Sequence, residues 1–171
     1  MQNFKEKLEG LSLEAKKKFL RETMDHLPKE DLFKLSEYVF LEQENELKHF
    51  LAEQIAEDPK RALFTARYLL TSNHPDDGLA VLKYYGARII THAGPSLDHT
   101  TTIPMLVEAW DDEDYRDARW AISMAISKMI NSPINTVLRS LKSNPEAEVG
   151  LLEGIKSYTS IDVSKFSYRE L

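Results

Sequence analysis

Five histidines and a run of acidic residues are the side chains of this chain whose types could support chemistry. The histidines are His26, His49, His74, His92 and His99. None of them forms an HExxH pair or another tight ligand spacing, so we expect no metal site and no cofactor. His92 and His99 flank Asp98, and a carboxylate beside an imidazole could act as a general base if the two met in a cleft. The alternative is that Asp98 or the threonines after it cap a helix that begins near Pro104.

Motifs for nucleotide binding and covalent catalysis are missing from the sequence. Gly86 and Gly94 are isolated glycines, so there is neither a GxGxxG pattern nor a Walker pattern. No Gly-x-Ser-x-Gly elbow occurs either. The chain has no cysteine, which removes thiol nucleophiles, disulfides and cysteine-based zinc sites together. We therefore expect a protein that is not an enzyme.

Acidic and aromatic residues gather between positions 108 and 120. Six acids lie within ten residues, against one arginine, and a calcium loop is excluded because the required glycine and terminal glutamate are absent. Helix capping alone would account for the acids at 111–113. Tyr and Trp beside charged residues are favoured anchors at protein interfaces, so we predict a binding face here. Its candidate residues are Tyr84, Arg88, Trp110, Asp112, Asp114, Tyr115, Arg116, Asp117 and Trp120. The alternative for Trp120, and for Tyr85 beside Tyr84, is a place in the core.

Composition and charge narrow the class of partner. The chain has 171 residues, 42% of them hydrophobic and 29% charged, which suits one globular domain. A net charge of −6 disfavours a nucleic-acid partner and favours a protein with a basic surface. The trio Lys16, Lys17 and Lys18 reads as a solvated helix face. The N-terminus lacks the apolar core of a signal peptide, and no window resembles a membrane span, so we expect a cytoplasmic protein that does not enter a membrane.

The apolar spacing predicts an all-α protein. Ser12 and Asp58, the latter followed by proline, are expected helix caps, and Pro28 is expected at another helix start. The apolar stripe from Leu32 to Ile55 fits one long helix, or two with a break near Glu44. Further helices are expected over 79–89, as a pair over 103–129, from 132 to about 141, and from 144 to about 158. The segment 94–102 is the one long loop that the sequence predicts.

The pair of helices at 103–129 carries a family resemblance. Residues 118–129 read Ala-Arg-Trp-Ala-Ile-Ser-Met-Ala-Ile-Ser-Lys-Met, which resembles the second helix of a HEAT repeat. A weaker copy lies at 147–155, and another degenerate one lies upstream, so the resemblance covers 59–158. In such families the position of Arg119 usually hydrogen-bonds to acids of an adjacent turn. We expect one all-α domain over 1–171, made of an N-terminal hairpin region (1–57), the HEAT-like repeat region (59–158) and a C-terminal tail (159–171). Its helical hairpins would stack as a short HEAT-like solenoid, with an irregular helical bundle as the alternative.

These features favour a non-catalytic protein-binding module. A small, acidic, cysteine-free helical chain is similar in class to immunity or antitoxin-type proteins, which inhibit a basic partner by covering it. The alternative is a HEAT-like enzyme or a protein of the chromophore-lyase type, with a site near 92–102, because a fold does not exclude an activity. A further alternative is a homo-oligomer that associates through its terminal hairpin and tail.

Overall fold

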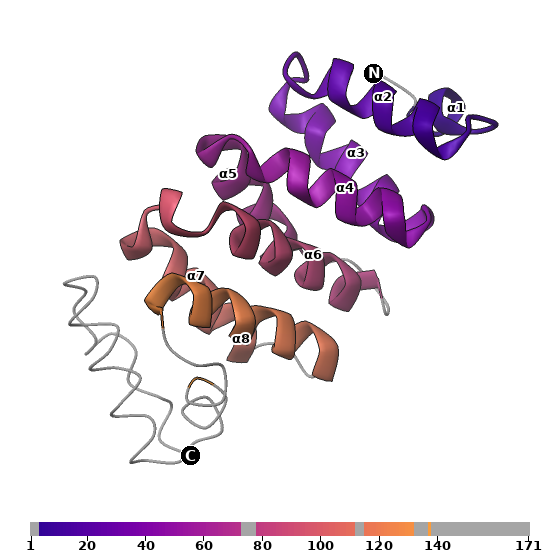
Figure 1. Cartoon of the computed structure of the whole chain (residues 1–171). Helices are drawn as coiled ribbons and strands as arrows, with labels where there is room; N and C mark the ends of the chain where they lie inside the picture. Colours follow the sequence, from indigo (N-terminus) through magenta and orange to yellow (C-terminus); the bar gives the residue numbers. More distant parts are fainter. Residues whose placement is uncertain (1–3, 73–77, 112–114, 132–136, 138–171) are drawn as a thin grey trace.

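The computed structural model of the chain describes residues 4–72, 78–111, 115–131 and 137, and this part is all-α (Figure 1). It contains eight α-helices and one short 3₁₀ helix, which confirms the expected fold class. The helices are α1 (Phe4–Leu8), α2 (Leu13–Met24), α3 (Lys29–Glu42), α4 (Asn45–Ala56), α5 (Pro59–Leu70), α6 (Gly78–Ala93), α7 (His99–Asp111) and α8 (Arg116–Ile130), with the 3₁₀ helix η1 (Gly94–Ser96) between α6 and α7.

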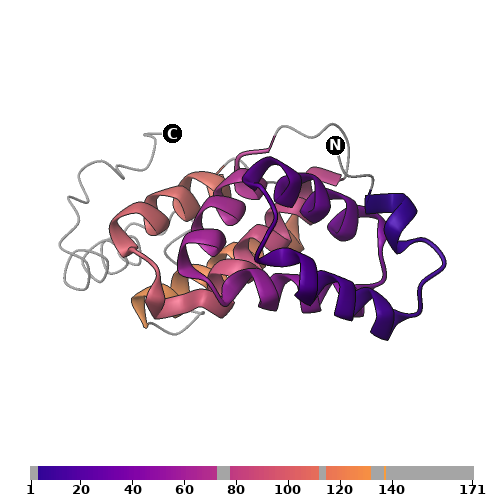
Figure 2. The same ribbon diagram turned by 90° about the horizontal axis from the view of Figure 1, so that it is seen from above.

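The helices pack in two layers, and most contacts join neighbouring helices. The even-numbered helices contact one another in the order α2, α4, α6 and α8, and the odd-numbered helices do so in the order α1, α3, α5 and α7. The two layers are visible from above in Figure 2, and in Figure 1 the helices α4, α6 and α8 run side by side across the molecule. Each odd helix from α3 onward also packs against the even helix that follows it.

One continuous hydrophobic core joins the two layers. Buried side chains of this core run from Phe4 in α1 to Val137, the last residue that the structure describes. Phe40 of α3 and Tyr85 of α6 stack in its middle, with ring centroids 4.5 Å apart and planes 3° from parallel. Offset or parallel aromatic pairs of this kind add roughly 0.5–1.5 kcal/mol beyond the burial of their area. The described helices therefore form one packed unit.

Local capping chemistry places two of the helix starts as expected. The Ser12 side chain accepts a hydrogen bond from the Ala15 amide (3.3 Å), and the Asp58 carboxylate accepts one from the Arg61 amide (2.8 Å). In both cases a side-chain oxygen satisfies an amide that has no partner within the helix. Pro28 precedes α3 as its N-terminal flanking residue. The long apolar stripe is broken before Asn45, so it forms the two helices α3 and α4 rather than one.

The segment 94–102 is not a long loop, and this expectation was wrong. It contains η1 and the first turn of α7, which begins at His99 rather than near Pro104. The reason is the Asp98 carboxylate, which accepts hydrogen bonds from the hydroxyl groups of Thr100 (2.8 Å) and Thr101 (2.6 Å) and from the Thr100 amide (3.2 Å). These bonds start the helix early, and Pro104 then lies inside it.

Two of the three neighbouring lysines are not part of a solvated face. Lys16 pairs with Glu44 (3.1 Å) and Lys17 with Glu46 (2.6 Å), so both join α2 to the start of α4, and each side chain is only 14% exposed. The hydrogen bond to Glu46 is the largest cause that raises the pKa of Lys17. Lys18 alone keeps the expected solvated position, since its side chain is 74% exposed.

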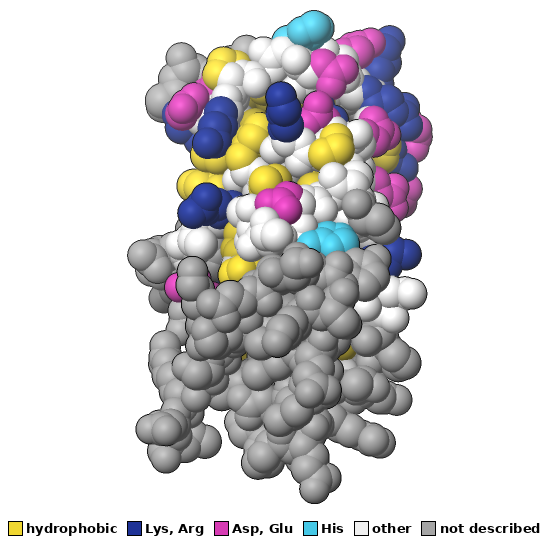
Figure 3. All heavy atoms as spheres, turned by 90° about the vertical axis from the view of Figure 1, so that its left-hand side faces the viewer, with side chains coloured by type: hydrophobic (Ala, Val, Ile, Leu, Met, Phe, Trp, Pro, Cys, Tyr) yellow, Lys and Arg dark blue, Asp and Glu magenta, His cyan; other side chains and the backbone are white. Residues whose placement is uncertain are grey.

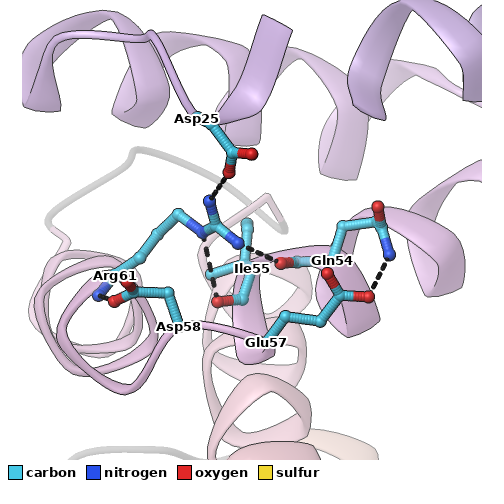
Figure 4. Close-up of polar contacts among 6 residues, drawn as sticks. All are labelled: Asp25, Gln54, Ile55, Glu57, Asp58 and Arg61. Carbon is cyan, nitrogen blue, oxygen red and sulfur yellow. Dashed lines mark hydrogen bonds and ion pairs between the residues drawn. The ribbon is translucent and has the colours of Figure 1, made fainter. Parts of the chain in front are cut away.

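An arginine in α5 ties three segments together (Figure 4). The Arg61 guanidinium donates to the Gln54 carbonyl (2.7 Å) and the Ile55 carbonyl (3.4 Å), and it pairs with the Asp25 carboxylate (2.7 Å). The two carbonyls belong to the last turn of α4, where backbone acceptors have no partner within the helix. The side chain of Arg61 is 12% exposed, so it works as a largely buried cap on α4 that also reaches the end of α2.

A glycine allows α5 and α6 to approach closely. A Cβ atom on Gly86 of α6 would lie 3.1 Å from the Leu69 Cβ and 3.3 Å from the Ala66 carbonyl oxygen. These distances are shorter than ordinary van der Waals contacts, and one of the opposing atoms is backbone. The absence of a side chain at this position therefore sets the spacing of the hairpin.

Several sequence predictions fall outside the described residues. They are the helices expected over 132–141 and 144–158, the weaker repeat copy at 147–155 and the tail at 159–171, although Val137 is helical and buried. Among the described helices, none is long and apolar enough to cross a membrane.

Candidate functional site

An open groove crosses the N-terminal halves of α4, α6 and α8. Its volume is about 1050 Å³, which is slightly above the range of roughly 300–1,000 Å³ typical of small-molecule pockets. The lining residues are Asn45, Lys48 and His49 of α4, Ala80, Val81, Tyr84 and Tyr85 of α6, and Tyr115, Arg116, Asp117, Ala118 and Trp120 at the start of α8. Three helices that are far apart in the sequence thus build one surface.

The groove brings together five of the nine residues predicted for the binding face. Tyr84, Tyr115, Arg116, Asp117 and Trp120 all line it. Tyr84 is part of an edge-to-face pair with the Tyr85 ring, with ring centroids 5.0 Å apart. The predicted aromatic patch is therefore contiguous in space, although its residues come from separate helical hairpins.

Two aromatic side chains at the start of α8 stand out into solvent. Tyr115 is 51% exposed and Trp120 is 45% exposed, which puts them among the most exposed large hydrophobic side chains of the described chain. Tyr115 is the N-terminal flanking residue of α8, and it places no side-chain cap on that helix. The alternative in which Trp120 belongs to the core is therefore wrong, because the core face of α8 is supplied by small and aliphatic residues such as Ala121 and Ile122.

Trp110, which was also predicted for the binding face, does not line the groove and lies against Arg119. Trp110 of α7 is 7% exposed, and the guanidinium carbon of Arg119 lies 4.2 Å from the centroid of its ring. A cation over an indole face is attracted by the ring quadrupole. The hydrogen bond from Arg119 to neighbouring acids that the HEAT resemblance implies is not seen among the described residues, where the Arg119 Nε has no hydrogen-bond partner. Trp110 is thus a core residue rather than a contact residue.

Arg88 lies one turn beyond the groove on α6. It does not line the groove, and its positive charge, after the larger effect of burial, helps to lower the pKa of His92. Glu53 and His49 of α4 also influence His92, so this histidine faces α4. Arg88 was predicted for the same binding face as Tyr84, but only Tyr84 lines the groove.

Tyr85 belongs to the core, as one of the two alternatives predicted. It is 5% exposed, and burial raises its pKa to about 12. Its ring touches both the Phe40 ring and the His49 ring, the latter at 5.6 Å between centroids. Tyr85 therefore forms the floor of the groove and joins it to the core.

The α4 side of the groove was missed by the sequence reasoning. The apolar stripe around Lys48 and His49 predicts a helix, and it gives no reason to place these two residues on the binding face. Burial lowers the pKa of Lys48, and its ammonium group forms no ion pair or hydrogen bond with the described residues. The position of these residues along the helix could have indicated their role. Lys48 and His49 lie in the first turns of α4, which begins at Asn45, just as Trp120 lies in the first turns of α8.

The described part of the groove is not acidic. Its charged side chains are Lys48, Arg116 and Asp117, and the last two pair with each other at 3.1 Å. The acids Asp112 and Asp114, predicted for the same face, lie outside the described residues. The opposite side of the molecule, drawn in Figure 3, carries positive and negative side chains intermixed around hydrophobic ones.

The alternative site near 92–102 gains no support from the local geometry. The oxygens of Asp98 accept hydrogen bonds from Thr101 and Thr100, and these bonds lower its pKa. Within the described residues, no hydrogen bond joins Asp98 to His92. In the described parts of the chain, no three His, Cys, Asp or Glu side chains are grouped so that they could hold a metal ion.

Comparison of the whole chain with protein-family models, with curated proteins and with solved structures finds no match.

Proposed function

We propose that the protein is a non-catalytic binding module that holds a segment of another protein in the groove across α4, α6 and α8. The observation that carries the proposal is the exposure of Trp120 and Tyr115 over an open groove with aromatic walls. Exposed tryptophan and tyrosine around a concavity are typical anchors of protein interfaces. The side chains of a partner segment would pack between these rings.

The scaffold in this proposal is a short HEAT-like solenoid. It is supported by the packing of even helices on even helices and of odd helices on odd helices, and by the buried small residues of α8, the helix that packs on α6. In a solenoid each hairpin contacts mainly its neighbours, and one layer of helices offers an extended binding surface. The groove would occupy that layer.

The negative net charge of the chain favours a more specific proposal, in which the protein is an immunity or antitoxin-type inhibitor of a basic partner. The net charge of −6 and the acids at 111–114 would speed the approach of a partner with a basic surface. Such steering acts over a distance of about 8–10 Å at physiological salt, whereas the groove acts in contact. The two effects are separable, because salt weakens the first much more than the second.

Affinity capture with matched variants tests this proposal. The wild-type chain, Trp120→Ser and Leu11→Ser are immobilised and exposed to extract from the native source, and the retained proteins are identified by mass spectrometry. Leu11 is a suitable control, because it is also an exposed large hydrophobic residue (39%) but lies between α1 and α2. We expect a partner that is retained by the wild type and by Leu11→Ser, and that is lost with Trp120→Ser.

The captured partner is then produced separately, and its binding to each variant is measured by calorimetry. Equal affinity for all three proteins would refute the groove as the binding site. Retention of the chain itself, confirmed by a concentration-dependent solution mass, would replace the partner by a homo-oligomer.

A further inference from the structure

Among the described residues, the lysine of the groove, Lys48, has no ion-pair partner, because its neighbours occupy the nearby acids. Glu44 lies one turn before Lys48 in the sequence and would be its natural ion-pair partner, but Glu44 is engaged by Lys16 at 3.1 Å. Glu46 is engaged in the same way by Lys17 at 2.6 Å. Two ion pairs from α2 thus occupy the acids at the start of α4, and the Lys48 ammonium is left facing the groove with no carboxylate among the described residues.

The remaining polar side chains described in the groove can all donate a hydrogen bond, apart from that of Asp117. The Tyr84 hydroxyl, the Trp120 indole nitrogen and the His49 ring nitrogens form no hydrogen bond with other described residues. An indole nitrogen can only donate, and a lysine ammonium can only donate. Among the described lining residues the single carboxylate is that of Asp117, and Arg116 already pairs with it. The described surface therefore offers several donors and lacks a carboxylate that is free of an ion pair.

The direction of the helices adds to this polarity. The lining residues of α4, α6 and α8 come from the N-terminal halves of these helices, so the positive ends of three helix dipoles lie at the same edge. The N-terminal flanking residues of α4 and α8, Glu44 and Tyr115, place no side-chain cap on their helices. Both the side chains and the backbone thus favour a negative group in the groove.

The walls favour an apolar group beside that negative one. The described lining includes the aromatic residues Tyr84, Tyr85, Tyr115 and Trp120. Lys48 and His49 come from α4, whereas Trp120 comes from α8, with α6 between the two helices. A ligand that uses both sides needs a carboxylate and an aromatic or aliphatic side chain on one short chain.

We infer that the groove binds an acidic peptide segment of the partner protein, with a carboxylate held by Lys48 and a neighbouring aromatic or aliphatic side chain packed against Trp120. This inference rests on the proposed function and names the chemistry of its ligand. It concerns the contact in the groove, and a partner whose surface is basic elsewhere can carry such a segment. The closest rival ligand is single-stranded nucleic acid, which also uses aromatic rings and cations.

An array of short synthetic peptides tests the inference. Each peptide has a central Phe, Tyr or Leu, and it is made in three versions in which the flanking positions hold acids, the corresponding amides, or lysines. The full chain is applied as wild type, Lys48→Gln, Trp120→Ser and Lys18→Gln, and oligouridylate is included as a separate probe. Lys18 is the matched lysine control, because its side chain is exposed and belongs to α2. Circular dichroism and thermal unfolding establish that each variant is folded.

The acidic peptides are expected to bind the wild type on the order of tenfold more tightly than their amide versions, which is the usual worth of one charge-assisted hydrogen bond. Lys48→Gln should remove this preference, Trp120→Ser should weaken all versions, and Lys18→Gln should behave as the wild type does.

The outcomes separate this inference from the proposed function. Peptide binding that depends on Trp120 but shows no preference for acids, or prefers lysines, would overturn the inference and leave the binding module intact. If no peptide depends on Trp120, both ideas fail. Oligouridylate bound more tightly than every peptide, and lost in Trp120→Ser, would replace both by a nucleic-acid site.

Discussion

Replacement of Arg61 by alanine is expected to lower the free energy of unfolding by about 3 kcal/mol. The guanidinium is 12% exposed and donates to the Gln54 and Ile55 carbonyls, which end α4 (Figure 4). A hydrogen bond to a charged group contributes roughly 1.5–3 kcal/mol. The bond to Gln54 (2.7 Å) should give most of the effect, since the bond to Ile55 is long (3.4 Å).

The ion pair of Arg61 with Asp25 should contribute little to this loss. The Asp25 side chain is 75% exposed, and exposed ion pairs contribute roughly 0–1 kcal/mol. Asp25→Asn is therefore the matched control, with an expected loss below about 1 kcal/mol. Arg61→Lys should fall between the two, because a single ammonium group lacks the planar fork that reaches several acceptors at once.

Urea unfolding followed by circular dichroism measures these losses, and thermal unfolding gives a second estimate. A loss of 3 kcal/mol corresponds to a fall of roughly 6–12 °C in Tm for a chain of this size. The reasoning would be refuted if Arg61→Ala and Asp25→Asn destabilised the protein equally. That result would mean that the cap on α4 contributes nothing beyond the surface ion pair.

Three further predictions concern packing and titration. Gly86→Val should destabilise the protein by about 1–3 kcal/mol in urea unfolding, because the valine side chain would approach Leu69 more closely than van der Waals contact allows. An unchanged midpoint of urea unfolding would contradict the close approach of α5 and α6. Tyr68 and Tyr85 should ionise near pH 12 in a near-ultraviolet absorbance titration of the folded protein. Because their folded-state pKa is raised, their contribution to stability should be full below about pH 10 and should be lost as pH rises toward 12. Ionisation of every tyrosine near pH 10 in the folded protein would argue against their burial. Hydrogen bonds from Thr101 and Thr100 lower the folded-state pKa of Asp98. The destabilisation caused by Asp98→Ala should therefore be full above about pH 4 and should shrink as pH falls through that lowered pKa. A destabilisation that does not change with pH would exclude the carboxylate as the cap of α7.

Local chemistry explains which parts of the fold could be predicted from the sequence. The starts of α2 and α5 follow from Ser12 and Asp58, because a cap needs only the amides of the next few residues. The start of α7 follows the same rule, yet Pro104 drew the prediction to a later position. Proline favours a first turn but does not require one, and the bonds of Thr100 and Thr101 to Asp98 decided the outcome.

Tertiary packing explains what the sequence could not reveal about the site. The placement of Trp120 and Tyr84 on one surface could be anticipated, because helices of successive hairpins were expected to lie side by side. The contribution of Lys48 and His49 to the groove could not be anticipated, because it depends on α4 and α8 both packing against α6. The pairing of Lys16 with Glu44 was hidden for the same reason, because it joins residues of separate helices.

The central claim is that a partner segment occupies the groove at Trp120. The chain has two tryptophans, so a ¹⁵N–¹H correlation spectrum of protein labelled at tryptophan contains two indole signals. Trp120 is 45% exposed in the groove, whereas Trp110 is 7% exposed under Arg119, and Trp120→Phe assigns the two signals. When the tightest acidic peptide of the array is added, the Trp120 signal should shift to saturation while the Trp110 signal stays in place. Saturable binding that leaves the Trp120 signal unmoved would contradict the account.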